Sequence, residues 1–121
     1  MAAILEIHRV LSNTTWLFFF FLGVWGLFRA FRREAVDGSY LGALVIAELL
    51  FIVQGILGLI LGLGEATFDE IHVLYGVFGI VFLPFIYFYQ RGDDSNRAQW
   101  VYAFATLFMF GIALRSIQTA P

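Results

Sequence analysis

Four long apolar stretches, separated by short charged links, constrain the fold of this chain more than any other feature. They cover residues 5–28, 40–63, 71–89 and 99–117. A helix of about 20 apolar residues, rising about 1.5 Å per residue, crosses the hydrocarbon core of a bilayer. Because the stretches are continuous rather than alternating, a membrane β-barrel is disfavoured. The sequence therefore predicts four transmembrane helices.

The composition argues against a soluble domain of this size. Hydrophobic residues make up 61% of the 121 residues and charged residues only 13%, whereas a small soluble domain leaves much of its surface in water. The links are short, so consecutive helices should be antiparallel neighbours, with the first and third helices on a diagonal. The expected fold is an all-α integral membrane protein with a single transmembrane domain, residues 1–121, built as a four-helix bundle.

Arginine is unevenly distributed between the two ends of the predicted bundle. Only Arg9 and Arg115 lie at the end that holds the chain termini. Because arginine-rich segments stay on the cytoplasmic side, the first and third links should be cytoplasmic and both termini extracytoplasmic, in a bacterial inner (plasma) membrane. The start of the chain lacks a basic region, so no cleavable signal peptide is expected. The arginines in or beside the first and third links are Arg29, Arg32, Arg33, Arg91 and Arg97.

Tryptophans and tyrosines gather near the predicted cytoplasmic boundary. Amphipathic rings favour the headgroup level of a membrane, so this clustering agrees with the orientation that the arginines indicate. The expected interfacial belt consists of Trp25, Tyr40, Tyr87, Tyr89, Trp100 and Tyr102.

The first and third helices begin with the same three residues. Glu6-Ile7-His8 recurs as Glu70-Ile71-His72, and small residues follow each histidine four and seven positions later. The sequence therefore indicates an internal repeat of a two-helix unit, whose copies would be related by a pseudo-twofold axis along the membrane normal. The alternative is that two helix starts look alike by chance. The small residues are Ser12 and Thr15 in the first copy and Gly76 and Gly79 in the second.

The chain contains only two histidines, and the repeat gives them equivalent places. His8 and His72 each begin an odd-numbered helix, so both should lie at the same depth and face each other across the diagonal. Two opposed imidazoles are the axial ligands of a six-coordinate b-type haem, which is suited to electron transfer.

The residues around the two histidines fit the same interpretation. Small side chains at Ser12, Gly76 and Gly79 would lie on the same helical stripes as the histidines and leave a slot for a porphyrin. Arg9 and Arg115 lie at the same end and could pair with the haem propionates.

Less specific interpretations remain open for these residues. A histidine at a membrane boundary is often an interface anchor, and glycine or serine in a transmembrane helix usually marks close helix packing. Each histidine could instead ligate the magnesium of a chlorophyll-type pigment. A transition-metal ion bound by two histidines alone would be under-coordinated.

Two polar residues lie inside the second apolar stretch. Glu48 falls near the middle of the bilayer, where an ionisable group is costly and is by default a functional candidate. It shares a heptad stripe with Gly55 and Gly62, which favours a position facing the bundle or a partner. A proton relay, a contact with a quinone head group or a transport role is the functional interpretation, and a hydrogen bond to another helix is the structural one. Gln54 is interpreted in the same way.

On the pattern of His8 with Ser12, and of His72 with Gly76 and Gly79, the chain resembles small four-helix membrane b-type cytochromes. The resemblance covers the whole chain in topology but only these positions in motif. It implies haem b and electron transfer. Many such cytochromes hold two haems with two histidines on each of two helices. This chain lacks the second pair, so neither a second haem nor a quinone site is inferred from the resemblance.

Other residue types narrow the function further. The absence of cysteine excludes thiolate metal sites and disulfide exchange, and a net charge of -2 without a basic run gives no support for a nucleic-acid partner. The sequence predicts a membrane b-type cytochrome or cytochrome subunit, with one bis-histidine haem near the extracytoplasmic face, rather than a stand-alone enzyme. The alternative is a cofactor-free accessory subunit of a larger membrane complex. Besides lipid, the expected partners are other membrane subunits or a quinone.

Overall fold

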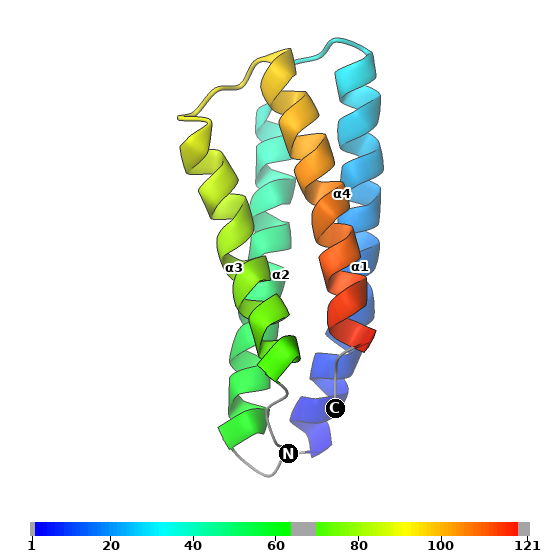
Figure 1. Ribbon diagram of the computed structural model, residues 1–121. Helices are drawn as coiled ribbons and strands as arrows, with labels where there is room; N and C mark the ends of the chain where they lie inside the picture. Colours follow the sequence, from blue (N-terminus) through cyan, green and yellow to red (C-terminus); the bar gives the residue numbers. More distant parts are fainter. Residues whose placement is uncertain (1, 64–69, 119–121) are drawn as a thin grey trace.

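The computed structural model describes residues 2–63 and 70–118, and these residues form four α-helices (Figure 1). The helices are α1 (Ala2–Phe31), α2 (Gly38–Leu63), α3 (Glu70–Tyr89) and α4 (Asn96–Gln118). Each is long and apolar enough to cross a membrane, and the two described ranges contain no strand. The predicted all-α transmembrane four-helix bundle is therefore confirmed. The second predicted link lies outside the described residues except at its last position.

Each helix packs against two neighbours and lies diagonal to the remaining one. α2 and α4 both flank α1 and both flank α3, whereas α1 and α3 do not pack directly against each other. Figure 1 shows the start of α1 and the end of α4 at one end of the bundle, which we call the terminal end. The opposite end, which holds the first and third links, is the link end. The bundle therefore has the antiparallel order and the diagonal α1–α3 pair that the sequence predicts.

Caps at the link end make α1 and α2 longer than their apolar stretches. α1 closes with a left-handed residue, Arg33 (φ 60°), and the Glu34 N–H donates to the Arg29 carbonyl at 3.0 Å, as in a Schellman turn. At the start of α2, the Asp37 carboxylate accepts a hydrogen bond of 2.8 Å from the Tyr40 N–H, which is an N-cap. These bonds satisfy backbone groups that a helix end leaves unpaired.

Arg29 joins three parts of the link end. Its guanidinium forms ion pairs with Glu34 at 2.9 Å and with Asp37 at 3.2 Å. It also donates to the Ala35 carbonyl, and its Nε donates to Gln99 Oε1 at 3.3 Å. Gln99 is fully buried in α4. Arg29 therefore ties the end of α1 to the first link and to the start of α4.

Glycines on α1 let α4 approach closely. A Cβ atom at Gly23 would lie 2.7 Å from Leu107 Cγ. A Cβ atom at Gly26 would lie 3.2 Å from Ala103 Cα and would collide with the Tyr40 hydroxyl. Small residues serve this purpose at helix interfaces in membranes, and α1 and α4 share a more extensive contact than any other pair of helices.

This close packing is not repeated in the second half of the chain. Aligning His8 with His72 places Tyr87 of α3, and Gln90 just after it, opposite Gly23 and Gly26 of α1. These larger side chains do not allow the same approach, and α3 packs less extensively on α2 than α1 does on α4. The likeness between the two halves is therefore closest at the terminal end.

The expected aromatic belt is found only in part. Tyr87 and Tyr89 are well exposed, but Tyr40 and Tyr102 are core residues, with 0% and 2% of their surface exposed. For these two tyrosines the prediction was wrong. The physical reason at Tyr40 is that Gly26 leaves room for its ring, and its hydroxyl donates to a backbone carbonyl of α1 at 3.3 Å.

Candidate functional site

The two histidines meet at the terminal end of the bundle. His8 lies near the start of α1 and His72 in the first turn of α3. Their ring centroids are 6.4 Å apart and their ring planes are inclined at 80°. Both residues are half-buried. The structure thus brings the two predicted imidazoles together across the diagonal, with neither turned out into lipid away from the other.

A carbonyl on α4 fixes the hydrogen position on His72. His72 Nδ1 lies 2.8 Å from the carbonyl oxygen of Ser116. Because a carbonyl can only accept, Nδ1 carries the hydrogen and the lone pair of the neutral ring lies on Nε2. Histidines that ligate metals commonly donate their other ring N–H to a carbonyl in this way.

His8 has a polar neighbourhood on α2. The Gln54 amide nitrogen donates to the His8 carbonyl and to Ser12 Oγ, each at 3.0 Å. Ser12 Oγ itself donates to the His8 carbonyl at 2.9 Å. Gly58 borders the imidazole, since a Cβ atom there would lie 3.6 Å from His8 Cε1. The predicted site residue Ser12 therefore lies at the histidine site. Its side chain takes part in a hydrogen-bond network and does not simply leave room for a porphyrin.

The small residues that follow His72 have different surroundings. Gly76 borders open space, because a Cβ atom there would meet nothing within 4 Å. Gly79 is covered by Phe51, whose Cδ1 would lie 2.6 Å from such an atom. Thr15, the equivalent of Gly79 in α1, is buried and donates to the Leu11 carbonyl at 2.7 Å. Of the two glycines, Gly76 therefore leaves open space one turn from His72 along α3, and Gly79 serves core packing.

Two arginines are the sequence neighbours of residues in the histidine site. Arg9 follows His8, and Arg115 precedes Ser116, whose carbonyl binds His72. Both side chains are exposed, and neither has an acidic partner among the described residues. Arg115 donates to Gln118 Oε1 at 3.1 Å. The terminal end thus presents two cations that are not used in ion pairs within the described part of the chain.

Glu48 lies apart from the histidines. Six residues separate it from Gln54, which corresponds to about 9 Å along the helix axis. Both carboxylate oxygens are enclosed and have no hydrogen-bond partner among the described residues. The predicted position facing the interior agrees with this enclosure, but the structure does not bring Glu48 into the site.

The separation of the two ring centroids is compatible with an iron held between two imidazoles. With a metal–nitrogen distance of about 2 Å on each side, and each ring nitrogen about 1 Å from its ring centre, two axial imidazoles hold their centroids about 6 Å apart. The observed distance is 6.4 Å. The described residues contain no group of three or more His, Cys, Asp or Glu side chains that could hold a bare metal ion. A tetrapyrrole supplies four nitrogens of its own, so two histidines suffice for it.

Comparisons of the chain with protein families, with curated proteins and with solved structures find no match. We therefore infer its function from the residues of the bundle itself.

Proposed function

We propose that the chain is a single-haem membrane b-type cytochrome, or a cytochrome subunit, with His8 and His72 as the axial ligands. The observation that carries this proposal is the imidazole pair with ring centroids 6.4 Å apart. The Ser116 carbonyl supports it, because it leaves the lone pair of His72 on Nε2. When bound, haem b would supply an iron that cycles between its ferric and ferrous states.

The surrounding residues would hold this group in place. α1 and α3 present the two imidazoles from opposite sides, and Gly76 provides room beside His72. Arg9 and Arg115 are exposed at the same end, where their guanidinium groups would pair with the propionates. The apolar helices would exclude water from the macrocycle and so influence its redox potential.

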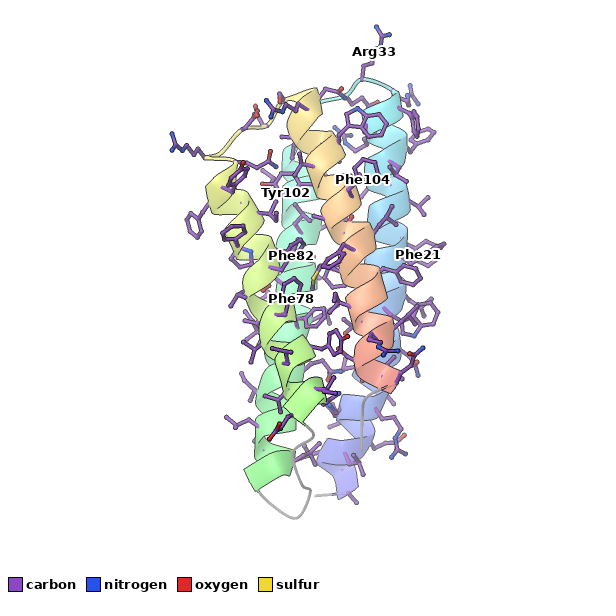
Figure 2. All side chains as sticks on the ribbon, in the orientation of Figure 1. Phe21, Arg33, Phe78, Phe82, Tyr102 and Phe104 are labelled. Carbon is purple, nitrogen blue, oxygen red and sulfur yellow. The ribbon has the colours of Figure 1, made fainter. Side chains whose placement is uncertain are left out.

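The distribution of arginine suggests how the bundle is oriented. Figure 2 shows Arg33 projecting from the link end. If this end is cytoplasmic, as the arginine count favours, the histidine pair lies near the extracytoplasmic face and both termini are extracytoplasmic. In a bacterial inner membrane, the electron donor or acceptor would then be another membrane subunit or a quinone.

A reduced-minus-oxidised visible spectrum tests the proposal. We expect the protein, purified with haem supplied during expression, to show the sharp band of a six-coordinate b haem. His8→Ala and His72→Ala should each abolish this band, whereas Arg33→Ala, at the far end of the bundle, should retain it. Retention of the band in both histidine variants would refute the ligand assignment.

A second candidate function is that of a cofactor-free accessory subunit. An apolar groove of about 570 Å³ on the outside of α1 and α2 favours it, since a helix of another subunit could lie there. Figure 2 shows one lining residue, Phe21, projecting away from the bundle. If the purified protein contains no haem although haem was supplied during expression, the result would favour the accessory subunit over the cytochrome. A pigment on each histidine is less consistent with the structure, because 6.4 Å between the rings leaves no room for two macrocycles.

A further inference from the structure

Gln54 is the polar side chain of α2 that contacts the histidine site. Its amide nitrogen donates to the backbone carbonyl of His8 and to Ser12 Oγ, each at 3.0 Å. These two bonds fix where the amide lies relative to α1. They also fix its orientation, because the His8 carbonyl can only accept and so must face the amide nitrogen rather than the amide oxygen.

Two enclosed atoms beside these bonds have complementary chemistry. Gln54 Oε1 is an acceptor, and His8 Nδ1 becomes a donor when the hydrogen of the neutral ring lies on it. Both atoms are shielded from solvent, and neither has a hydrogen-bond partner among the described residues. The Gln54 side chain is already bound to His8 through the backbone carbonyl of that residue. Buried polar atoms of this kind are normally paired, and each of these two atoms has the chemistry that the other lacks.

We propose that Gln54 is a positioning residue for His8, with Oε1 accepting the Nδ1–H hydrogen bond of the imidazole. This inference rests on the proposed function in one respect, namely that the oriented ring serves as a metal ligand. The bond places the lone pair of His8 on Nε2. It gives His8 the arrangement that the Ser116 carbonyl gives His72, so that each ring uses Nδ1 as its anchor and Nε2 as its donor to a shared iron.

The two anchors come from different helices. Gln54 holds His8 from α2, and Ser116 holds His72 from α4. Since α2 and α4 are the two helices that flank both α1 and α3, all four helices contribute to the orientation of the pair. Anchors of this kind raise the basicity of a ligating imidazole, and their loss weakens metal binding by roughly 10–100-fold.

Nitrogen NMR of the haem-free protein tests the inference without any bound group. The chain has only two histidines, so ¹⁵N-histidine labelling gives two sets of ring signals, which His72→Gln assigns. We expect His8 to carry its hydrogen on Nδ1. Gln54→Met, which removes the acceptor at similar volume, should move that hydrogen toward Nε2. Ser12→Ala removes a neighbouring hydroxyl but not the acceptor, and it should leave the His8 tautomer unchanged.

A second variant keeps the inference falsifiable if Gln54→Met does not fold. Gln54→Glu retains an oxygen acceptor and should preserve the Nδ1–H tautomer. A wild-type His8 with its hydrogen on Nε2, or a tautomer that is unchanged in a folded Gln54→Met protein, would overturn the inference. Haem titration separates it from the proposed function. If the protein binds haem but Gln54→Met leaves the His8 tautomer unchanged, only the role of Gln54 is refuted. If His8 has the expected tautomer but the protein binds no haem, the cytochrome proposal is refuted and the Gln54–His8 hydrogen bond is retained.

Discussion

Two polar side chains of α2, Gln54 and Glu48, are accommodated in different ways by the same membrane helix. Gln54 makes two hydrogen bonds to α1 beside His8. Glu48 is enclosed at both oxygens and makes none within the described part of the chain. Since an enclosed polar group without a partner costs free energy, the two residues should respond in opposite ways to substitution by an apolar side chain of similar size.

Glu48→Leu should stabilise the isolated protein. The change removes an unpaired polar group, which costs about 1–3 kcal/mol when enclosed, so the free energy of unfolding in detergent should rise by about that amount. Thermal unfolding followed by circular dichroism measures it. Gln54→Leu is the matched control on the same helix and should lower the stability by a similar amount, because it breaks two hydrogen bonds. A clear loss of stability in Glu48→Leu would contradict this account and would indicate a partner for the carboxyl group.

Among the helices, α1 and α4 form the closest pair, and single glycines determine their approach. Gly26 lies against Tyr40 and Ala103, whereas a Cβ atom added at Gly42 of α2 would meet nothing within 4 Å. The two residues are chemically identical and both lie inside apolar helices. They therefore separate the effect of close packing from the effect of glycine on helix propensity.

Gly26→Ala should destabilise the bundle, by about 1–3 kcal/mol, because the added methyl group overpacks the α1–α4 contact. Gly42→Ala should be neutral or stabilising by about 0.5–1 kcal/mol, since alanine is the better helix former and meets no neighbour. Unfolding of both variants in the same detergent provides the comparison. Equal effects of the two substitutions would show that α1 and α4 do not approach as closely as described.

Arg29 provides a second test at the level of elements. Arg29→Lys keeps the positive charge but removes the guanidinium group. Only the several N–H donors of that group can bind Glu34, Asp37 and Gln99 at the same time. We expect the free energy of unfolding to fall by about 1.5–3 kcal/mol, the range for hydrogen bonds to charged groups. Arg33→Lys, which changes an exposed side chain at the same end of the bundle, should have no measurable effect. A loss as large in Arg33→Lys would show that the effect does not come from the Arg29 contacts and would contradict this account.

The helices can be predicted from the sequence, but the faces they turn to one another cannot. Apolar length locates all four spans, because a transmembrane helix must satisfy its backbone internally. The lipid-facing side of such a helix is as apolar as the core side, so no pattern distinguishes them. Sequence reasoning therefore assigns Tyr40 to an interfacial belt, although it is fully buried. The caps that lengthen α1 and α2 depend on Arg33 and Asp37. Both residues lie in the polar first link, where a hydropathy pattern does not distinguish one residue from the next.

The pairing of the two histidines can be predicted from their positions along the helices. The residues that surround the pair cannot be predicted, because they depend on how each helix is rotated about its axis. His8 and His72 are the only histidines and follow identical residues, so their common depth is evident from the sequence alone. The contact of Gln54 with His8 depends on which side of α2 faces α1, and the sequence contains no signal for that rotation. The difference between Gly76 and Gly79 likewise depends on where the Phe51 ring lies.

For the whole molecule, the orientation in the membrane that we propose from the arginines can be measured directly. The natural chain has no cysteine, so single cysteines can be introduced without background. Glu6→Cys at the terminal end should react with a membrane-impermeant thiol reagent in intact bacterial cells. Arg33→Cys at the link end should react only after permeabilisation. The reverse pattern would place the histidine pair on the cytoplasmic side.

The proposed sharing of one iron by His8 and His72 is tested most directly by electron paramagnetic resonance of the oxidised, haem-loaded protein. The ring planes are inclined at 80°, and nearly perpendicular axial imidazoles give a low-spin ferric signal whose largest g value exceeds that of parallel rings. We predict this signal in the wild-type protein and its loss in His8→Ala and in His72→Ala. A high-spin signal in the wild-type protein would show that at most one imidazole reaches the iron and would contradict the account.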